Sequence, residues 1–185
     1  DKFSPKKKFE PWQKICERWK QKYSLNKESL YEKTSKISHY QLINALSKAL
    51  PENLVISTGS SGLGIEAFYT IFKNKEGQRV YLTSGLGAMG YGLPSAIGAC
   101  FANQRAPMVL VESDGSFQLN IQEMATISYH KLPICLILIN NKGYASIRNT
   151  QRSYFESRYI GTGPEAGLKL PNMRKVASTY NIPFL

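Results

Sequence analysis

Two apolar runs, 108–111 and 134–139, constrain the fold most, because each is followed closely by a residue that can bind a cation. Asp114 follows the first run and Asn141 follows the second, and an amphipathic segment, 118–130, lies between them. This pattern predicts a strand–helix–strand crossover with parallel strands. Parallel neighbours end at the same edge of a sheet, where open α/β folds bind their ligands. We therefore expect Asp114 and Asn141 to lie close together.

A carboxylate and an amide oxygen are hard donors, and such donors suit Mg²⁺ better than zinc or copper. Two side chains would hold Mg²⁺ weakly, so phosphate oxygens, water or a backbone carbonyl must complete the site. Gly115 and Ser116 lie where the strand passes into a helix, so their N–H groups and the positive helix end can face a phosphate. The sequence therefore predicts a diphosphate bridged by a metal ion.

Residues 113–117 (Ser-Asp-Gly-Ser-Phe) and 140–144 (Asn-Asn-Lys-Gly-Tyr) together resemble the metal motif of acetolactate synthase-like enzymes. These enzymes use thiamine diphosphate, and their motif is Gly-Asp-Gly followed further along the chain by Asn-Asn. The resemblance implies that the side chains of Asp114 and Asn141 and the carbonyl of Gly143 bind Mg²⁺.

Two residues depart from the family motif without removing a metal ligand. Ser113 replaces the first glycine, and Lys142 places a positive charge where it either weakens the metal or forms a salt bridge with a phosphate. Two further positions bear on the substrate. Pyruvate decarboxylases carry a glutamate where this chain has Ile147, and typical acetolactate synthases carry a tryptophan where residues 148–153 have none. The substrate within the family therefore stays open.

Two upstream segments are similar to other parts of the same family. Residues 83–94 resemble the segment that holds the aminopyrimidine ring, which implies that Met89 bends the cofactor and that the carbonyl of Gly87 accepts from its amine. Residues 58–62 resemble the first turn that contacts phosphate, with Ser60 as the hydroxyl. The implied cofactor contacts are Gly59, Ser60, Gly87, Ala88, Met89, Gly115, Ser116, Asn141, Gly143, Tyr144 and Ala145.

The glycine segment also allows an alternative interpretation. Gly85, Gly87 and Gly90 satisfy the GxGxxG pattern of dinucleotide-binding folds, and Glu112 ends the next strand, where a nicotinamide cofactor needs an acidic partner. However, that pattern normally follows the first strand of its domain, whereas here a strand and helix, 54–72, precede it. An NAD-binding Rossmann domain of an oxidoreductase is therefore the alternative.

The alternation of apolar runs and amphipathic segments predicts an α/β fold, with a doubly wound parallel sheet covered by helices on both faces. This is also the thiamine diphosphate-binding fold that the resemblance implies. The continuous apolar run 134–139 predicts a central strand, buried on both sides. We expect strands at 54–57, 80–83, 108–112 and 134–139, and helices at 11–23, 39–50, 64–72, 93–102, 121–129 and 174–180.

The positive charge is concentrated in the first 50 residues. They hold 12 Lys or Arg against 5 Asp or Glu, a net charge of +7 out of the total +11. The lysines at 6–8 indicate either a nucleic-acid or membrane patch or a solvated linker, and no recognition motif favours the patch. We interpret residues 1–36 as a basic helical linker, which resembles the segment that follows the family's middle domain. Residues 37–185 then form a thiamine diphosphate-binding domain, truncated at its C-terminal end, whose sheet we expect to lack its last element.

The family resemblance implies decarboxylation and carboligation of 2-keto acids. In the family a glutamate on another domain of the partner subunit activates the cofactor. We therefore expect no catalytic residue in this chain, no turnover by the isolated chain, and a homodimer or tetramer in the full-length enzyme. Arg148 and Arg152 either bind a carboxylate or sulfonate of the substrate or face solvent.

Composition excludes several other classes of protein. Cys16, Cys100 and Cys135 are odd in number and widely spaced, so we expect buried thiols and neither disulfides nor a zinc site. No apolar run reaches the roughly 18 residues of a membrane-spanning helix, and the first residues lack a signal core. We expect a cytoplasmic protein with no membrane or nucleic-acid partner, and a non-catalytic basic binding module is the third interpretation.

Overall fold

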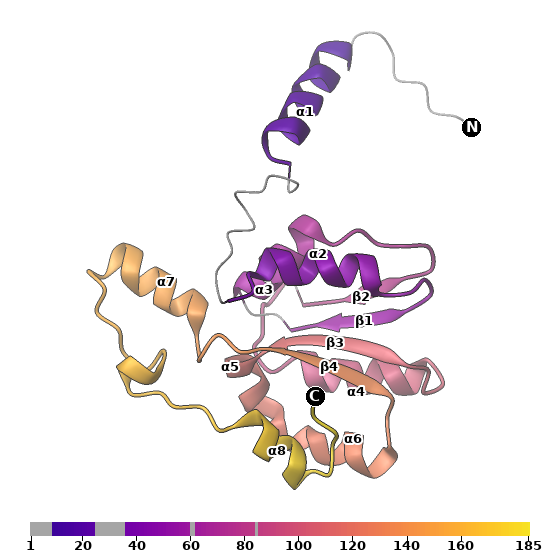
Figure 1. Ribbon diagram of the computed structural model, residues 1–185, viewed down its shortest axis with the longest axis vertical. Helices are drawn as coiled ribbons and strands as arrows, with labels where there is room; N and C mark the ends of the chain where they lie inside the picture. The colour runs from indigo at the N-terminus through magenta and orange to yellow at the C-terminus, as the bar shows by residue number, and fades with distance from the viewer. Residues whose placement is uncertain (1–8, 25–35, 60–61, 84) are drawn as a thin grey trace.

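The computed structural model describes residues 9–24, 36–59, 62–83 and 85–185. These residues form an α/β fold around a four-stranded sheet, in which every strand pair is parallel. Figure 1 shows helices on both sides of this sheet, so the expected fold class is confirmed. The strands lie in the order β2-β1-β3-β4, with β1 at Val55–Thr58, β2 at Arg79–Tyr81, β3 at Met108–Ser113 and β4 at Ile134–Ile139.

Each face of the sheet is covered by its own hydrophobic core. Because successive residues of a strand point to opposite faces, Leu110 belongs to one core and Val111 to the other. Both side chains are almost completely buried. The helices α2 (His39–Ala49) and α3 (Gly62–Ile71) cover the face of Val111, and α4 (Gly92–Ala102), α6 (Met124–His130) and α8 (Met173–Thr179) cover the face of Leu110.

The prediction that residues 134–139 form a central, doubly buried strand is wrong. In the described part of the chain, β4 pairs only with β3 and lies at the edge of the sheet, and its side chains are half-buried or exposed. β3 is instead buried along its whole length. Apolar composition does not separate the two positions, because strand order depends on the path of the chain and not on the residues of one strand.

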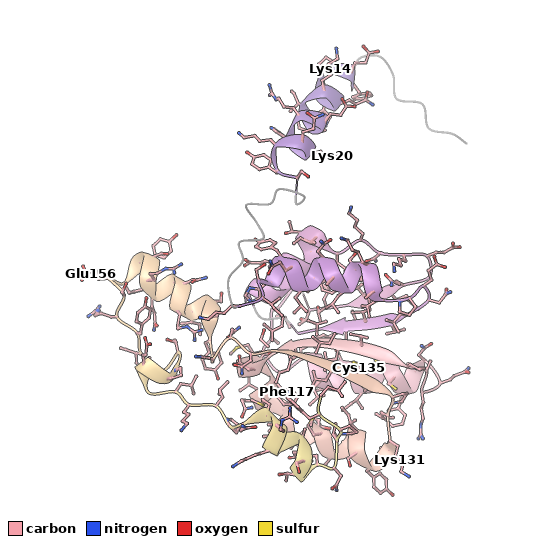
Figure 2. The ribbon with its side chains drawn as sticks, in the orientation of Figure 1. Lys14, Lys20, Phe117, Lys131, Cys135 and Glu156 are labelled. Atoms are coloured by element: carbon pink, nitrogen blue, oxygen red, sulfur yellow. The ribbon has the colours of Figure 1, made fainter. Side chains whose placement is uncertain are left out.

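The three cysteines differ in how deeply they are buried. All three are free thiols, but only Cys100 is buried, as expected. Cys16 is half-buried, and Cys135 is exposed on the edge strand β4 (Figure 2). The expectation of three buried thiols is therefore wrong for Cys16 and Cys135.

The chain between β3 and β4 does not form one continuous helix. Helix α5 (Asp114–Phe117) is followed by a 3₁₀ segment, η3 (Gln118–Glu123), before α6 begins. The backbone leaves helical geometry at Asn120, with φ −136° and ψ 30°. There the side-chain Nδ2 of Asn120 donates a hydrogen bond of 2.8 Å to the carbonyl of Gly90. The helix expected at 121–129 is therefore confirmed only from Met124 onward.

Beyond the sheet, α7 (Ala145–Tyr154) is a helix that the sequence pattern did not predict. It follows the loop after β4 and leads to a short 3₁₀ turn, η4 (Pro164–Ala166). Near the N-terminus, α1 (Glu10–Lys22) matches the expected helix and has no buried residue. In the part of the chain that the structure describes, no helix is long and apolar enough to cross a membrane.

A pair of leucines tests the difference between the inner and the edge strand. Leu110 of β3 is fully buried, and its register partner Leu136 of β4, on the same face, is half-buried. We expect Leu110→Ala to lower the free energy of unfolding by about 2–5 kcal/mol and Leu136→Ala to lower it by clearly less. Urea denaturation of both variants measures this difference. Equal losses would contradict the assignment of β4 as the less buried strand.

Candidate functional site

Asp114, Asn141 and Gly143 converge at the edge where β3 and β4 end. The carboxylate of Asp114 is 99% buried, with 1% of its surface exposed. Its Oδ2 accepts the N–H of Gly143 at 3.1 Å and its Oδ1 accepts the N–H of Gly115 at 2.8 Å. One terminal atom of the Asn141 amide lies 3.1 Å from Asp114 Oδ1 and 2.5 Å from the carbonyl oxygen of Gly143. The expected meeting of Asp114 and Asn141 is therefore observed.

The amide of Asn141 fits this position in two orientations. With Oδ1 inward, the amide oxygen faces Asp114 Oδ1 and the Gly143 carbonyl oxygen, and no hydrogen bond joins it to either of them. With Nδ2 inward, the amide donates to both Asp114 Oδ1 and the Gly143 carbonyl. The first orientation is the one that a hard cation would stabilise, because Mg²⁺ binds carboxylate, amide and backbone oxygens. The donor set therefore fits the expected metal ion, and a metal-free site can close with hydrogen bonds.

Metals that need several charged or imidazole ligands fit less well. In the described residues, no three His, Cys, Asp or Glu side chains come close enough to share a metal ion. The site depends instead on one carboxylate and on neutral oxygens. Such a set leaves coordination positions for the phosphate oxygens that commonly accompany Mg²⁺.

The loop after β4 has an unusual backbone that turns its polar atoms toward Asp114. Lys142 and Gly143 both have positive φ, at 62° and 113°. Asn140 supports this turn, because its Oδ1 accepts the N–H of Lys142 at 3.2 Å. A Cβ atom at Gly143 would lie 2.7 Å from the carbonyl oxygen of Thr162, so the loop has no room for a larger residue there. Glycine is therefore required at Gly143 for both conformation and space.

Gly115 allows a similar close approach on the other side of the carboxylate. A Cβ atom at Gly115 would lie 2.8 Å from the ring of Tyr144 and 3.0 Å from the carbonyl oxygen of Gly143. The ring of Tyr144 therefore packs on Gly115 and closes this side of the site. Ala145 follows as the first residue of α7 and is half-buried. Contacts of Gly115, Tyr144 and Ala145 with a cofactor stay predictions.

The side chain of Ser116 links the metal-motif residues 113–117 to the glycine segment 83–94. Its side chain is 1% exposed, and its Oγ accepts the N–H of Gly90 at 2.8 Å. Asn120 also holds Gly90, because its side-chain amide donates a hydrogen bond to the Gly90 carbonyl. Gly90 has a φ of 79°. A Cβ atom added at Gly90 would lie 2.9 Å from side-chain atoms of both Leu119 and Asn120. Sequence reasoning missed Asn120, and its position three residues after the motif's Phe117 gave no signal.

The predicted aminopyrimidine segment presents accessible groups beside this anchor. Gly87 has a φ of 61°, and its N–H donates to the carbonyl of Thr83 at 2.9 Å. Met89 is 41% exposed, so part of its side chain is accessible beside the buried anchor. Ala88 lies between them and is exposed. Ser60 lies outside the described residues, whereas the N–H of Gly59 donates to the carbonyl of Val111 at 2.8 Å.

Glu112 is buried between Gly59 and Gly92. A Cβ at either glycine would overlap the carboxyl group, which is 2% exposed. Its Oε1 accepts the N–H of Ser113 at 2.9 Å, and within the described residues its Oε2 has no hydrogen bond. Burial raises the pKa of Glu112, and the backbone of Ser113 and the side chain of Ser116 offset part of this rise. A group so enclosed does not reach a ribose, so the nicotinamide alternative is not favoured.

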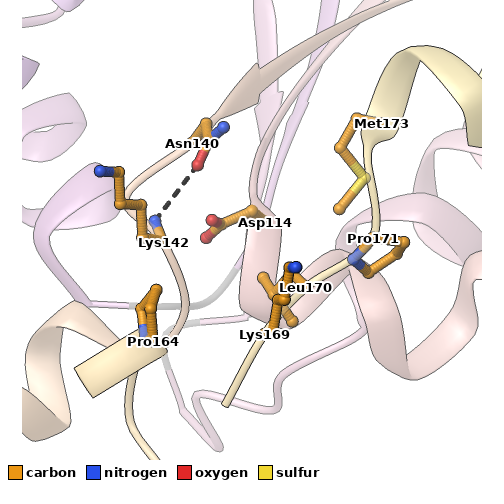
Figure 3. A pocket seen from close by; sticks show the side chains of 8 residues that line it. All are labelled: Asp114, Asn140, Lys142, Pro164, Lys169, Leu170, Pro171 and Met173. Atoms are coloured by element: carbon orange, nitrogen blue, oxygen red, sulfur yellow. Dashed lines mark hydrogen bonds between the residues drawn. The ribbon is translucent and has the colours of Figure 1, made fainter. Parts of the chain in front are cut away.

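A cavity of about 160 Å³ opens beside Asp114. Figure 3 shows Lys142 on one side of it and Lys169 on another, with Leu170, Pro171 and Met173 among its walls. Two lysines and one carboxylate in the lining, beside an apolar wall, suit an anionic ligand that arrives with a cation.

Arg148 and Arg152 differ, although they lie one turn apart on α7. Arg152 is exposed, in agreement with the option that it faces solvent. Arg148 is half-buried and donates to the main-chain carbonyls of Asn141, Lys142 and Thr162. The option that Arg148 faces solvent does not agree with this position, and binding of a substrate by Arg148 stays a prediction.

Comparison with known proteins identifies the family of this chain. The family described as "Thiamine pyrophosphate enzyme, C-terminal TPP binding domain" matches residues 58–185, which is more than half of the chain. The chain belongs to this family. All of the described groups around Asp114 and Asn141 lie inside the matched region.

Individual relatives are acetolactate synthases. The large subunit of acetolactate synthase from Porphyra purpurea is 31% identical over 182 residues, covering 92% of this chain and 28% of that protein. Isozyme 1 large subunit from Escherichia coli K12 is 38% identical over 123 residues, covering 65% of this chain and 21% of that protein. The chloroplastic enzyme of Arabidopsis thaliana is 33% identical, covering 95% and 26%. The chain therefore spans about a quarter of the length of these relatives.

The buried carboxyl of Glu112 predicts a dependence of stability on pH. An ordinary glutamate has a pKa of about 4.3 in the unfolded chain. Because burial raises the folded-state pKa, the folded chain binds this proton more tightly. The resulting stabilisation is complete below the unfolded pKa and is lost as the pH rises through the folded pKa.

We therefore expect Glu112→Gln to gain unfolding free energy relative to the parent chain as the pH rises from about 4 to 8. Urea denaturation with a chelator present measures this difference, because bound metal would add its own charge. Glu52→Gln, at an exposed position, is the control and should show no such trend. A Glu112→Gln difference that stays constant across this range would contradict the inferred cause.

Proposed function

We propose that this chain is the cofactor-binding part of an enzyme that uses thiamine diphosphate and Mg²⁺ to decarboxylate and ligate 2-keto acids. The observation that carries the proposal is the position of the Asn141 amide at the carboxyl edge of the sheet, where one terminal atom lies 3.1 Å from Asp114 Oδ1 and 2.5 Å from the Gly143 carbonyl oxygen. The match to the thiamine pyrophosphate family supports the cofactor. The acetolactate synthases among the relatives support the reaction class.

In this proposal, Asp114, Asn141 and Gly143 hold Mg²⁺, and the cation holds the diphosphate. Lys142 and Lys169 balance the phosphate charge at the cavity beside Asp114. When bound, thiamine diphosphate supplies the carbon nucleophile and takes up the electrons released on decarboxylation. The contribution of this chain is to bind and orient the cofactor.

The other end of the cofactor would lie at the aminopyrimidine segment. The carbonyl of Gly87 would accept from the exocyclic amine, and the exposed side chain of Met89 would support the bent conformation. Ser116 and Asn120 would keep this segment at a fixed distance from the metal, because both hold Gly90. In this proposal, one connected set of hydrogen bonds would position both ends of the cofactor.

We also propose that the full enzyme is a homodimer or tetramer and that the activating glutamate lies outside this chain. Relatives named as large subunits support an assembly. Since the chain spans about a quarter of these relatives, substrate choice and turnover belong to the whole protein. No residue of this chain is proposed to exchange protons with the substrate.

Calorimetric titration of the full chain with thiamine diphosphate tests the proposal. We expect saturable binding that requires Mg²⁺ and that falls by at least about tenfold in Asp114→Asn, because the Asp114 carboxylate is the charged group among the three proposed metal ligands. Glu52→Gln, at an exposed position outside the site, is the control and should bind like the parent chain. Saturable NADH binding without thiamine diphosphate binding would instead support the oxidoreductase alternative.

Met89 gives a second test that concerns the other end of the cofactor. We expect Met89→Ala to raise the Kd for thiamine diphosphate about tenfold, because an apolar support of this size contributes about 1–2 kcal/mol when covered by a ligand. The melting temperature should stay the same, since Met89 is 41% exposed in the free chain. Leu86→Ala, in the same loop and 90% exposed, is the matched control. Equal effects of the two substitutions would exclude a specific role for Met89.

A further inference from the structure

The guanidinium of Arg148 contacts the backbone of two loops at once. Its Nη2 donates to the carbonyl of Asn141 at 2.5 Å, and its Nη1 donates to the carbonyl of Lys142 at 3.1 Å and to that of Thr162. Asn141 and Lys142 belong to the loop that carries two of the three converging oxygens. Thr162 belongs to the loop that precedes η4. A single side chain of α7 therefore joins these loops.

The second loop is itself well fixed. Thr162 is 2% exposed, and its hydroxyl donates to Oε1 of Gln151 on α7 at 3.0 Å. Its carbonyl accepts the N–H of Tyr144 at 3.0 Å as well as the Arg148 hydrogen bond. A Cβ at Gly163 would lie 3.0 Å from Nη1 of Arg148 and 3.2 Å from the carbonyl oxygen of Lys142. The two loops therefore meet closely at Gly163, with little space for a side chain there.

The metal loop needs such support because its own backbone is strained. Lys142 has a φ of 62°, which a residue with a side chain adopts rarely. Arg148 donates hydrogen bonds to the carbonyls of Asn141 and Lys142, which belong to the two peptide units on either side of the Lys142 Cα atom. A charged donor makes stronger hydrogen bonds than a neutral one, and a planar guanidinium can reach two acceptors in fixed directions.

We propose that Arg148 is a positioning residue that holds the loop 140–143 so that Asn141 and the Gly143 carbonyl face Asp114. This inference rests on the proposed function, because it assigns the loop to a metal ion. Arg148 acts through the backbone and contacts neither the metal nor the substrate. Its three acceptors are main-chain oxygens, which explains why a motif of side-chain types did not reveal it.

The first experiment measures the Mg²⁺ dependence of thiamine diphosphate binding in the full chain. We expect Arg148→Met to raise the Mg²⁺ concentration for half-saturation about tenfold, with cofactor affinity at saturating Mg²⁺ nearly restored. A merely structural role would lower the melting temperature without this shift. Arg148→Lys should keep most of the defect, because one ammonium group does not reach all three carbonyls in the guanidinium geometry.

Arg152→Met is the matched control, since Arg152 lies one turn further on the same helix and is exposed. It removes the same charge and should leave the Mg²⁺ dependence unchanged. Thr162→Val is a milder second variant, in case Arg148→Met fails to fold. It removes the hydroxyl bond to Gln151 but keeps the Thr162 carbonyl, and we expect a smaller shift in the same direction.

The second experiment needs neither metal nor cofactor. The N–H groups of Gly143 and Tyr144 donate to Asp114 Oδ2 and to the Thr162 carbonyl, so their hydrogen exchange reports the order of the loop. We expect exchange at both amides to be about tenfold faster in Arg148→Met and unchanged in Arg152→Met.

The two readouts separate the two proposals. If the parent chain does not bind thiamine diphosphate with Mg²⁺ but exchange is faster in Arg148→Met, the proposed function fails and the restraint on the loop stands. If the parent chain binds and Arg148→Met leaves the Mg²⁺ dependence unchanged, the positioning role is overturned, whatever the exchange rates. A shift of equal size in Arg152→Met would also overturn it, because charge alone would then be the cause.

Discussion

The buried carboxylate of Asp114 is the group on which the geometry of the site depends. Its two oxygens accept N–H groups from Gly115, in helix α5 just after β3, and from Gly143, in the loop after β4. A buried carboxylate is stable only when its oxygens find donors or a cation, so the two loops are drawn to it. The same group that offers a negative charge to a ligand therefore also holds the loops in place.

Around this carboxylate, close approaches of glycine bring separate parts of the chain together. Gly115 lies against Tyr144, Gly143 lies against Thr162, and Gly90 is held by Ser116 and Asn120. Each contact leaves no space for a Cβ or uses a backbone that other residues adopt rarely. The loops around the carboxylate are thus held together largely by contacts of main-chain atoms.

Much of the arrangement could be predicted from local patterns. The apolar runs that became β3 and β4, and the polar residues after them, were sufficient for the parallel crossover and the meeting of Asp114 and Asn141. The edge position of β4 was not, because an apolar strand has the same composition at the edge as in the centre. The break at Asn120 was missed for a related reason, since its cause is a bond to Gly90, 30 residues earlier.

The sequence by itself determined the class of fold and the meeting of the Asp114 and Asn141 side chains at the carboxyl edge of the sheet. Both follow from the periodicity of apolar residues and from the direction of parallel strands. Tertiary structure alone decided which carbonyls lie within reach of Arg148, why Glu112 is enclosed between Gly59 and Gly92, and where the cavity beside Asp114 opens. The physical reason is that backbone carbonyls and N–H groups are the same at every residue. Whether such a group serves as a ligand or an anchor depends on where folding places it, and the type of a single residue does not reveal that position.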